Sequence, residues 1–117
     1  MKIIRLTRHK TQPAQDAEIQ RIWGPEADVI QVSESLPMDS REAVSRFDEI
    51  AVDADVVEAV LPIGLIEAIL KFSNFSKERG IVVRAITNRT QDAEGNVSFD
   101  FSHYEKIIKV ETVTEQL

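Results

Sequence analysis

The stretch that decides the fold runs from Asp55 to Gly64 and reads DVVEAVLPIG. Its first part, Asp55–Leu61, is mostly Val, Ala and Leu, as expected for a strand buried on both faces of a parallel sheet. Pro62-Ile63-Gly64 then leads directly into an apolar segment, so the strand passes into a helix. A strand followed at once by a helix is the unit from which α/β proteins are built.

The same unit recurs along the chain. Strands are predicted at Lys2–Leu6, Asp28–Val32, Asp55–Leu61 and Ile81–Thr87. The helices between them begin near Pro13, after the capping residue Asp39, and near Ile63, the last one running to about Phe75. This alternation predicts a Rossmann-like three-layer α/β sandwich with parallel strand order 2-1-3-4 and right-handed crossovers.

The last third of the chain has a different pattern. Asp92–Asn96 is a strong turn signal, and Val97–Phe101 alternates apolar and polar residues as a half-buried strand does. Tyr104–Val113 is a second β-rich run. We predict antiparallel strands added to the parallel core, which could pair within the monomer or across a subunit interface.

Length and composition limit the class of protein. The 117 residues predict a single domain, 1–117, with a net charge of −6 and no cysteine. The acidic balance argues against a protein that binds duplex nucleic acid through a broad basic surface. No apolar run has the length of a membrane helix and no signal peptide is evident, so we expect a cytoplasmic protein without membrane contact.

A basic cluster follows the first strand. Arg5, Arg8, His9 and Lys10 form the densest group of cationic side chains, and Thr7 lies among them. Ligands of open α/β sheets bind at the carboxyl ends of the strands, so the position favours a site for a small anionic ligand. There Arg8 would hold phosphate oxygens and His9 would exchange a proton. The alternative is a solvated loop, and the sequence alone leaves both open.

The ends of the other strands supply further candidates. Ser33 follows the second strand, together with Glu34 and Ser35. Pro62 and Gly64 follow the third. Asn88 and Arg89 follow the fourth, where Arg89 could join Arg8 on a phosphate and Asn88 could contact a base or a ribose hydroxyl.

Glu58 is unusual because central parallel strands are apolar on both faces. Counting from Asp55 and from Ile81 brings Glu58 and Arg84 to the same row of neighbouring strands. We therefore expect an ion pair between Glu58 and Arg84, with a structural or interface role favoured over a catalytic one.

Motifs for common cofactors are absent. The chain has no glycine-rich dinucleotide fingerprint, no P-loop, no zinc-protease motif and no nucleophile elbow. Two isolated histidines and scattered carboxylates make no convincing metal site. We expect neither a cofactor nor a metal ion.

The helix after Gly64 has an unusually wide apolar face. Its apolar residues cover an arc of roughly 200°, about twice what one sheet face requires. The simplest explanation is a second subunit, so a homodimer is expected.

Two segments carry a resemblance. The opening strand ending in Thr7-Arg8-His9, and the strand Ala54-Asp55-Val56-Val57 ending in Leu61-Pro62, resemble the small CRISPR-associated ring nucleases, relatives of the CARF domains. Lys10 stands where some members have proline, and Glu58 where a small residue is usual. The resemblance implies a role in antiviral defence and a dimer that binds cyclic oligoadenylate across its two-fold axis. It also implies metal-independent cleavage, by attack of a ribose 2′-hydroxyl on the adjacent phosphate.

The leading hypothesis is therefore a nucleotide-binding protein, and more narrowly a ring nuclease, with Arg8 and His9 as its catalytic pair. The alternative is a non-catalytic ligand sensor or protein-interaction module. A second acid–base group would distinguish the two, and the sequence offers none that is convincing.

Overall fold

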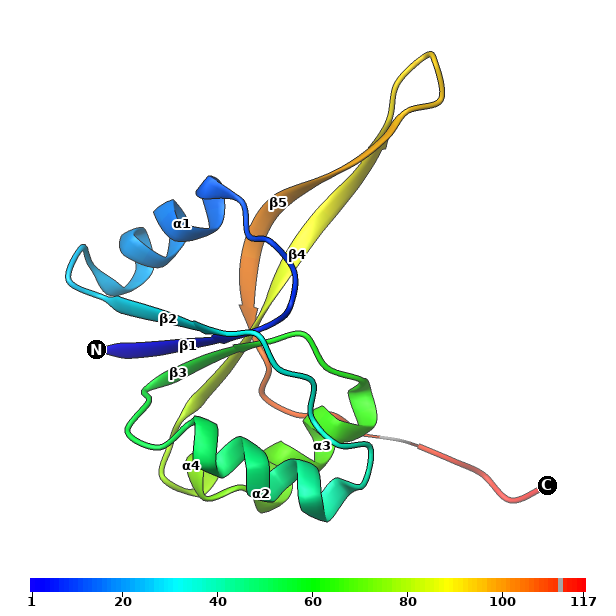
Figure 1. Ribbon diagram of the computed structural model, residues 1–117. Helices are drawn as coiled ribbons and strands as arrows, with labels where there is room; N and C mark the ends of the chain where they lie inside the picture. The colour runs from blue at the N-terminus through cyan, green and yellow to red at the C-terminus, as the bar shows by residue number, and fades with distance from the viewer. Residues whose placement is uncertain (112) are drawn as a thin grey trace.

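The computed structural model describes residues 1–111 and 113–117 and contains one mixed five-stranded sheet (Figure 1). The strands lie in the order β2-β1-β3-β4-β5. Their bounds are β1 Lys2–Leu6, β2 Asp28–Val32, β3 Val56–Ala59, β4 Ile81–Gln91 and β5 Val97–Lys106. The helices are α1 Pro13–Trp23, α2 Ser40–Ile50, α3 Ile63–Phe72 and α4 Asn74–Lys77.

The strand pairing confirms the α/β class and the order 2-1-3-4. β1 pairs in parallel with β2 and with β3, and β3 pairs in parallel with β4. β5 is antiparallel to β4 at the edge of the sheet. The order broadly fits a Rossmann-like layout with an antiparallel addition.

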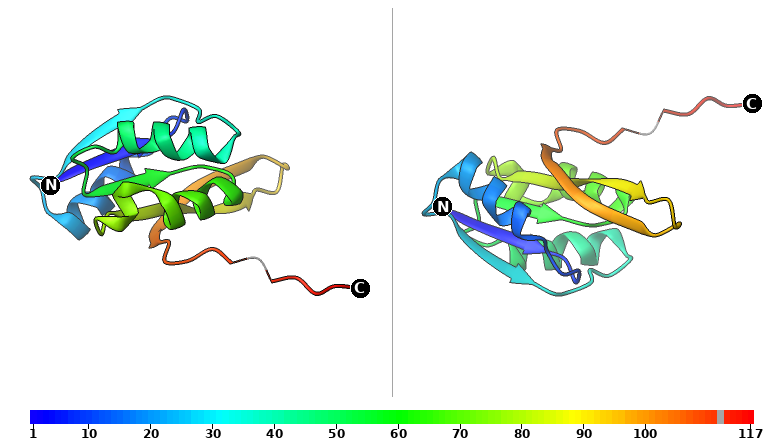
Figure 2. Two further views of the ribbon diagram at one scale, coloured as in Figure 1. Left: turned by 90° about the horizontal axis from the view of Figure 1, so that it is seen from below. Right: turned by 90° about the horizontal axis from the view of Figure 1, so that it is seen from above.

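The helices cover the two faces of the sheet unequally (Figures 1 and 2). α2, α3 and α4 lie on one face, where Phe47, Ile69 and Phe75 pack on Leu6 and Val57. On the other face α1 packs through Ile19 against Ile3, Val56 and Val83. The single-helix face therefore has a smaller apolar cluster, and it is the face to which Arg5 and Glu58 belong by strand alternation.

Local signals set the helix ends. The Asp39 carboxylate accepts hydrogen bonds from the backbone N–H groups of Arg41 and Glu42, as expected for the cap of α2. Pro13 opens α1, and Gly24 closes it with φ of 96°. The predicted helix from Ile63 to Phe75 is wrong in one respect, because Ser73 interrupts it. Ser73 caps the short α4 by accepting from Ser76 N–H.

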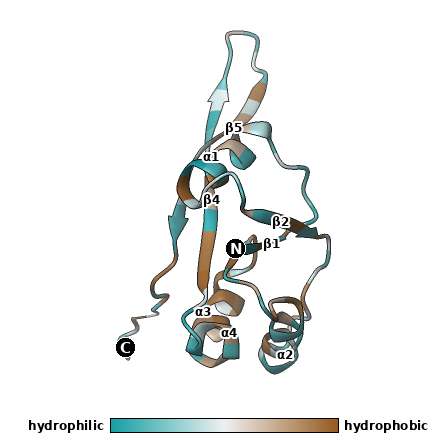
Figure 3. Ribbon diagram, turned by 90° about the vertical axis from the view of Figure 1, so that its left-hand side faces the viewer, coloured by the Kyte–Doolittle hydropathy of each residue, from teal (hydrophilic) through white to brown (hydrophobic). Residues whose placement is uncertain are grey.

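The β4–β5 hairpin is longer and more regular than the sequence indicated. β4 continues past Thr87 to Gln91, and β5 runs without a break from Val97 to Lys106, with a bulge opposite Ile86/Thr87. The predicted strand over Tyr104–Val113 is wrong beyond Lys106, since 107–111 and 113 form no strand; Thr112 lies outside the described residues. Figure 3 shows hydrophobic colour on β4 near α3, whereas the projecting hairpin carries both colours.

No helix in the described part of the chain has both the length and the apolar character required to span a bilayer.

Candidate functional site

A hollow of about 270 Å³ lies at the carboxyl ends of β1, β2 and β3. Thr7, Arg8 and His9 border it after β1, and Glu34 and Ser35 border it after β2. From β3 the chain contributes the segment Val60–Pro62, and α3 contributes Leu65. The hollow is therefore at the sheet edge where α/β proteins bind their ligands.

The loop that carries Arg8 and His9 is held by its backbone. The side-chain amide of Gln31, from β2, donates to the carbonyl oxygens of Thr7 and His9, each at 3.2 Å. The buried Thr7 hydroxyl oxygen accepts from His9 N–H at 3.1 Å. The side chains of Arg8 and His9 remain exposed, and Arg8 reaches Ser35 at 3.4 Å. A fixed backbone that presents the exposed Arg8 guanidinium suits anion binding.

The amino terminus of α3 opens beside this hollow. Pro62 is its cap residue, and no side-chain hydrogen bond from the described residues caps the helix. A proline has no side-chain acceptor, so the Gly64 N–H lacks the partner that the Asp39 carboxylate gives Arg41 at the same position of α2. The next N–H, of Leu65, donates to the Pro62 carbonyl oxygen. A Cβ added at Gly64 would meet nothing within 4 Å. Neither packing nor backbone strain thus explains a glycine there.

Glu34 is the only carboxylate that borders the hollow among the described residues, and it is already paired. The guanidinium of Arg46, on α2, donates a hydrogen bond to each of the two carboxylate oxygens of Glu34, both at 2.6 Å. These hydrogen bonds hold the pKa of Glu34 below its ordinary value. Glu34 is therefore a persistent anion and a poor proton donor.

The structure brings together only part of the predicted site. Thr7, Arg8, His9 and Pro62 border the hollow. Lys10, Ser33 and Gly64 are exposed neighbours of its lining residues and do not border it themselves.

Asn88 and Arg89 are placed elsewhere. They lie inside β4, opposite Asp100 and Phe99 of β5, rather than after its end. Neither residue borders the hollow.

The expected ion pair between Glu58 and Arg84 is wrong. β3 and β4 align with Val56 opposite Ile81, one residue away from the predicted register, so Glu58 faces Val83. A shift of one residue moves a side chain to the other face of the sheet. Arg84 pairs instead with Glu105 across the hairpin, at 2.9 Å.

Glu58 is paired with Arg5, which the sequence had placed in the basic cluster. The two residues are opposite each other on β3 and β1, and Arg5 Nε lies 2.7 Å from Glu58 Oε2 with both side chains buried. Arg5 also donates to Thr11 and to Asp16. Burial alone would lower the pKa of Arg5, but the Glu58 and Asp16 carboxylates outweigh it and raise the pKa. Arg5 is thus a structural cation and unavailable to a ligand at the rim.

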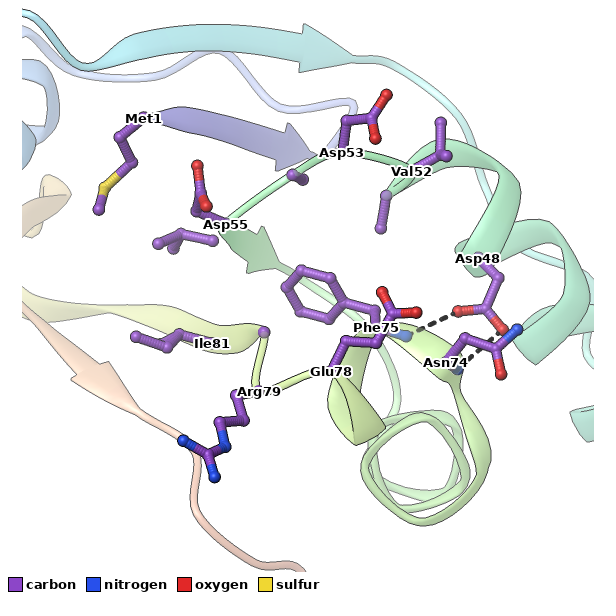
Figure 4. A pocket seen from close by; sticks show the side chains of 14 residues that line it. Met1, Asp48, Val52, Asp53, Asp55, Asn74, Phe75, Glu78, Arg79 and Ile81 are labelled. Atoms are coloured by element: carbon purple, nitrogen blue, oxygen red, sulfur yellow. Dashed lines mark hydrogen bonds between the residues drawn. The ribbon is translucent and has the colours of Figure 1, made fainter.

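A larger hollow of about 610 Å³ lies at the opposite end of the sheet, where β3 and β4 begin (Figure 4). Asp48, Asp53, Asp55 and Glu78 border it. Two of these carboxylates have structural roles: Asp48 accepts from the N–H groups of Asn74 and Phe75 at the start of α4, and Asp55 accepts from Lys2 N–H. The acidic lining disfavours binding of an anion. We therefore place the candidate site in the smaller hollow at the carboxyl ends of β1, β2 and β3, called the carboxyl edge below.

Comparison with models of known protein families and with curated proteins gives no match to this chain.

Sequence reasoning missed Gln31 and Gln12. These two glutamines bond the ends of the loop that carries Arg8 and His9 to β2 and to β5. A glutamine in a strand or before a helix carries no pattern of its own. Only the three-dimensional arrangement shows that their amides meet backbone groups distant in sequence.

Proposed function

We propose that the hollow at the carboxyl edge binds the phosphate of a nucleotide or cyclic oligonucleotide. The observation that carries this proposal is the uncapped amino terminus of α3 next to Arg8. Free N–H groups and the helix dipole attract anions at such a terminus. Gly64 would let a phosphate oxygen approach the backbone closely, which offsets the roughly 1 kcal/mol that a helical glycine costs relative to alanine.

The proposed reaction is metal-independent cleavage of a cyclic oligoadenylate-type messenger in antiviral defence, as the resemblance of Thr7-Arg8-His9 to the ring nucleases implies. A ribose 2′-hydroxyl would attack the adjacent phosphate and expel the 5′-oxygen. Arg8 would stabilise charge on the phosphate, and His9 would remove or supply a proton.

Two substitutions separate these roles. Arg8→Ala is expected to weaken binding about tenfold or more, since a charge-assisted hydrogen bond contributes roughly 1.5–3 kcal/mol. His9→Ala should leave binding nearly intact and slow cleavage roughly 10²-fold. Thermal shift and calorimetry with cyclic oligoadenylates and linear adenosine nucleotides measure binding, and chromatography of the products measures cleavage. Lys77→Ala, on α4, is a charge-matched control. Unchanged affinity and rate in both variants would contradict the proposal.

The second candidate is a sensor that binds the same ligand without cleaving it. The observation in its favour is the engagement of Glu34 by Arg46, which leaves His9 as the one unengaged proton-transfer group among the described residues that border the hollow. Binding without products, in wild type and in His9→Ala alike, would select the sensor.

We further propose a homodimer formed over this edge of the sheet. Met38, Val60 and Ile63 are exposed apolar side chains at the rim, and Met38 and Val60 border the hollow. A second copy packed on them would cover the ligand, in keeping with binding across a two-fold axis. The wide apolar face of α3 is a weaker argument, because Leu65, Ile66, Ala68 and Ile69 are buried within the monomer.

Val60→Glu is expected to dissociate this dimer, because it places a charge in the apolar contact. Sedimentation at micromolar concentration should show a monomer for Val60→Glu and a dimer for wild type. Val52→Glu, a similarly exposed valine at the opposite end of the sheet, is the matched control. A wild-type monomer of 13.2 kDa, with ligand present as well as absent, would refute the dimer.

A further inference from the structure

The side chain of Gln12 links the β4–β5 hairpin to the loop that follows β1. Its amide nitrogen donates to the carbonyl oxygen of Phe99 at 2.7 Å. Its amide oxygen accepts from Phe101 N–H at 2.9 Å. Both partners are backbone groups of β5, so the amide pairs with the strand edge as another strand would.

Gln12 is also the last residue of the loop that carries Arg8 and His9. Its own N–H donates to the Gln15 side chain at 2.8 Å, which fixes it at the start of α1. One residue earlier, the Thr11 hydroxyl accepts from the buried Arg5. At the other end of the loop, Gln31 holds Thr7 and His9. The loop is thus bonded to β2 at one end and to β5 at the other.

We infer that Gln12 is a positioning residue that couples the hairpin to the loop of Arg8 and His9. The exposed residues Thr87–Asp100 make up the projecting part of the hairpin, and they lie beyond the pairing of β4 with β3. Figure 1 shows the hairpin extending from the body of the protein beside the segment that joins β1 to α1. A partner or ligand that orders the hairpin therefore also orders the loop, and an ordered loop restrains the hairpin.

Amide hydrogen exchange on the ligand-free chain of 117 residues tests the coupling. Gln12→Met keeps the length and bulk of the side chain and removes both hydrogen bonds to β5. Exchange of the Phe101 amide is expected to quicken roughly tenfold, the effect of one lost hydrogen bond of ordinary strength. The His9 amide, which donates to Thr7 on the far side of the loop, is expected to quicken several-fold. Gln12→Ala should give the same pattern if methionine alters the packing.

Gln20→Met is the matched control, because Gln20 is an exposed glutamine of α1 that bonds neither β5 nor the loop. Its exchange pattern should equal that of wild type. Faster exchange at Phe101 with no change at His9 would show that Gln12 only fastens the hairpin, and the coupling would be overturned. No change at either amide would overturn it as well.

A second arm uses the ligand and rests on the proposed function. A cyclic oligoadenylate that binds the wild-type protein should slow exchange of the Phe101 amide, and should do so far less in Gln12→Met. A wild-type protein that binds no nucleotide would defeat the proposed function, while the ligand-free comparison of Phe101 and His9 would still decide the coupling. Binding with equal protection of Phe101 in both proteins would overturn the coupling alone.

Discussion

Glu58→Ala is expected to remove about 3–5 kcal/mol of the free energy of unfolding, the cost of breaking a buried ion pair by removing one partner. Arg5 would keep its charge with only 4 % of its side chain exposed. Among the described residues its one remaining ion-pair partner would be Asp16, whose side chain is 57 % exposed. Such a loss is a large fraction of the roughly 5–15 kcal/mol that stabilises a typical domain. Urea unfolding followed by circular dichroism measures the loss directly.

The double variant Arg5→Met/Glu58→Leu separates the charge from the packing. It removes both charges and leaves apolar side chains of similar length in their place. We expect it to be more stable than Glu58→Ala, since replacing both partners of a buried pair is often nearly neutral. A Glu58→Ala variant within 1 kcal/mol of wild type would mean that the pair contributes little.

Gly80→Ala is expected to destabilise the protein by about 1–3 kcal/mol through overpacking. A Cβ at Gly80 would lie 2.4 Å from the ring of Phe75, which is 6 % exposed. The ring cannot move away freely, because it packs edge-to-face on Phe47 with centroids 5.5 Å apart. Thermal unfolding should therefore show a lower midpoint.

Gly64→Ala is the control, because its expected change in stability has the opposite sign. Space is open around Gly64, so alanine should raise the stability of the ligand-free protein by about 0.4–1 kcal/mol. If a phosphate does approach α3 there, the same change should weaken ligand binding. Equal stability changes in Gly64→Ala and Gly80→Ala would contradict the packing argument at Gly80.

Much of the fold could be predicted because its signals are local. The apolar runs of β1 and β3, the Asp39 cap and the Asp92–Asn96 turn each depend on a few consecutive residues. What failed depended on register or on long-range contacts. The sequence aligns Ile81 of β4 with Asp55, whereas the structure pairs Ile81 with Val56, and this difference of one residue changes the partner of Glu58.

The candidate site shows the same division. Thr7, Arg8, His9 and Pro62 follow directly from the ends of β1 and β3, and these four border one hollow. The sequence predicts Asn88 and Arg89 on its rim because it predicts the end of β4 at Thr87. The pairing with β5 extends β4 to Gln91 and keeps both residues in the hairpin, an effect that the sequence of β4 alone does not contain.

The hairpin also affects the order in which the chain can fold. β4 and β5 are consecutive, and their turn is closed by Asp92, which accepts from the N–H groups of Glu94 and Asn96, so this unit can form within about 1–10 μs. Pairing of β3 with β4 closes a longer loop, which contains α3 and α4. Pairing of β1 with β3 closes a loop about twice as long again, which contains α1, β2 and α2, so its entropic cost is higher. During synthesis from the amino terminus, β3 therefore has an unpaired edge until β4 has been made. A pause in synthesis after β3 has left the ribosome and before β4 has left it would hold an apolar strand edge open to other chains, which is a point of aggregation risk that the finished protein no longer has.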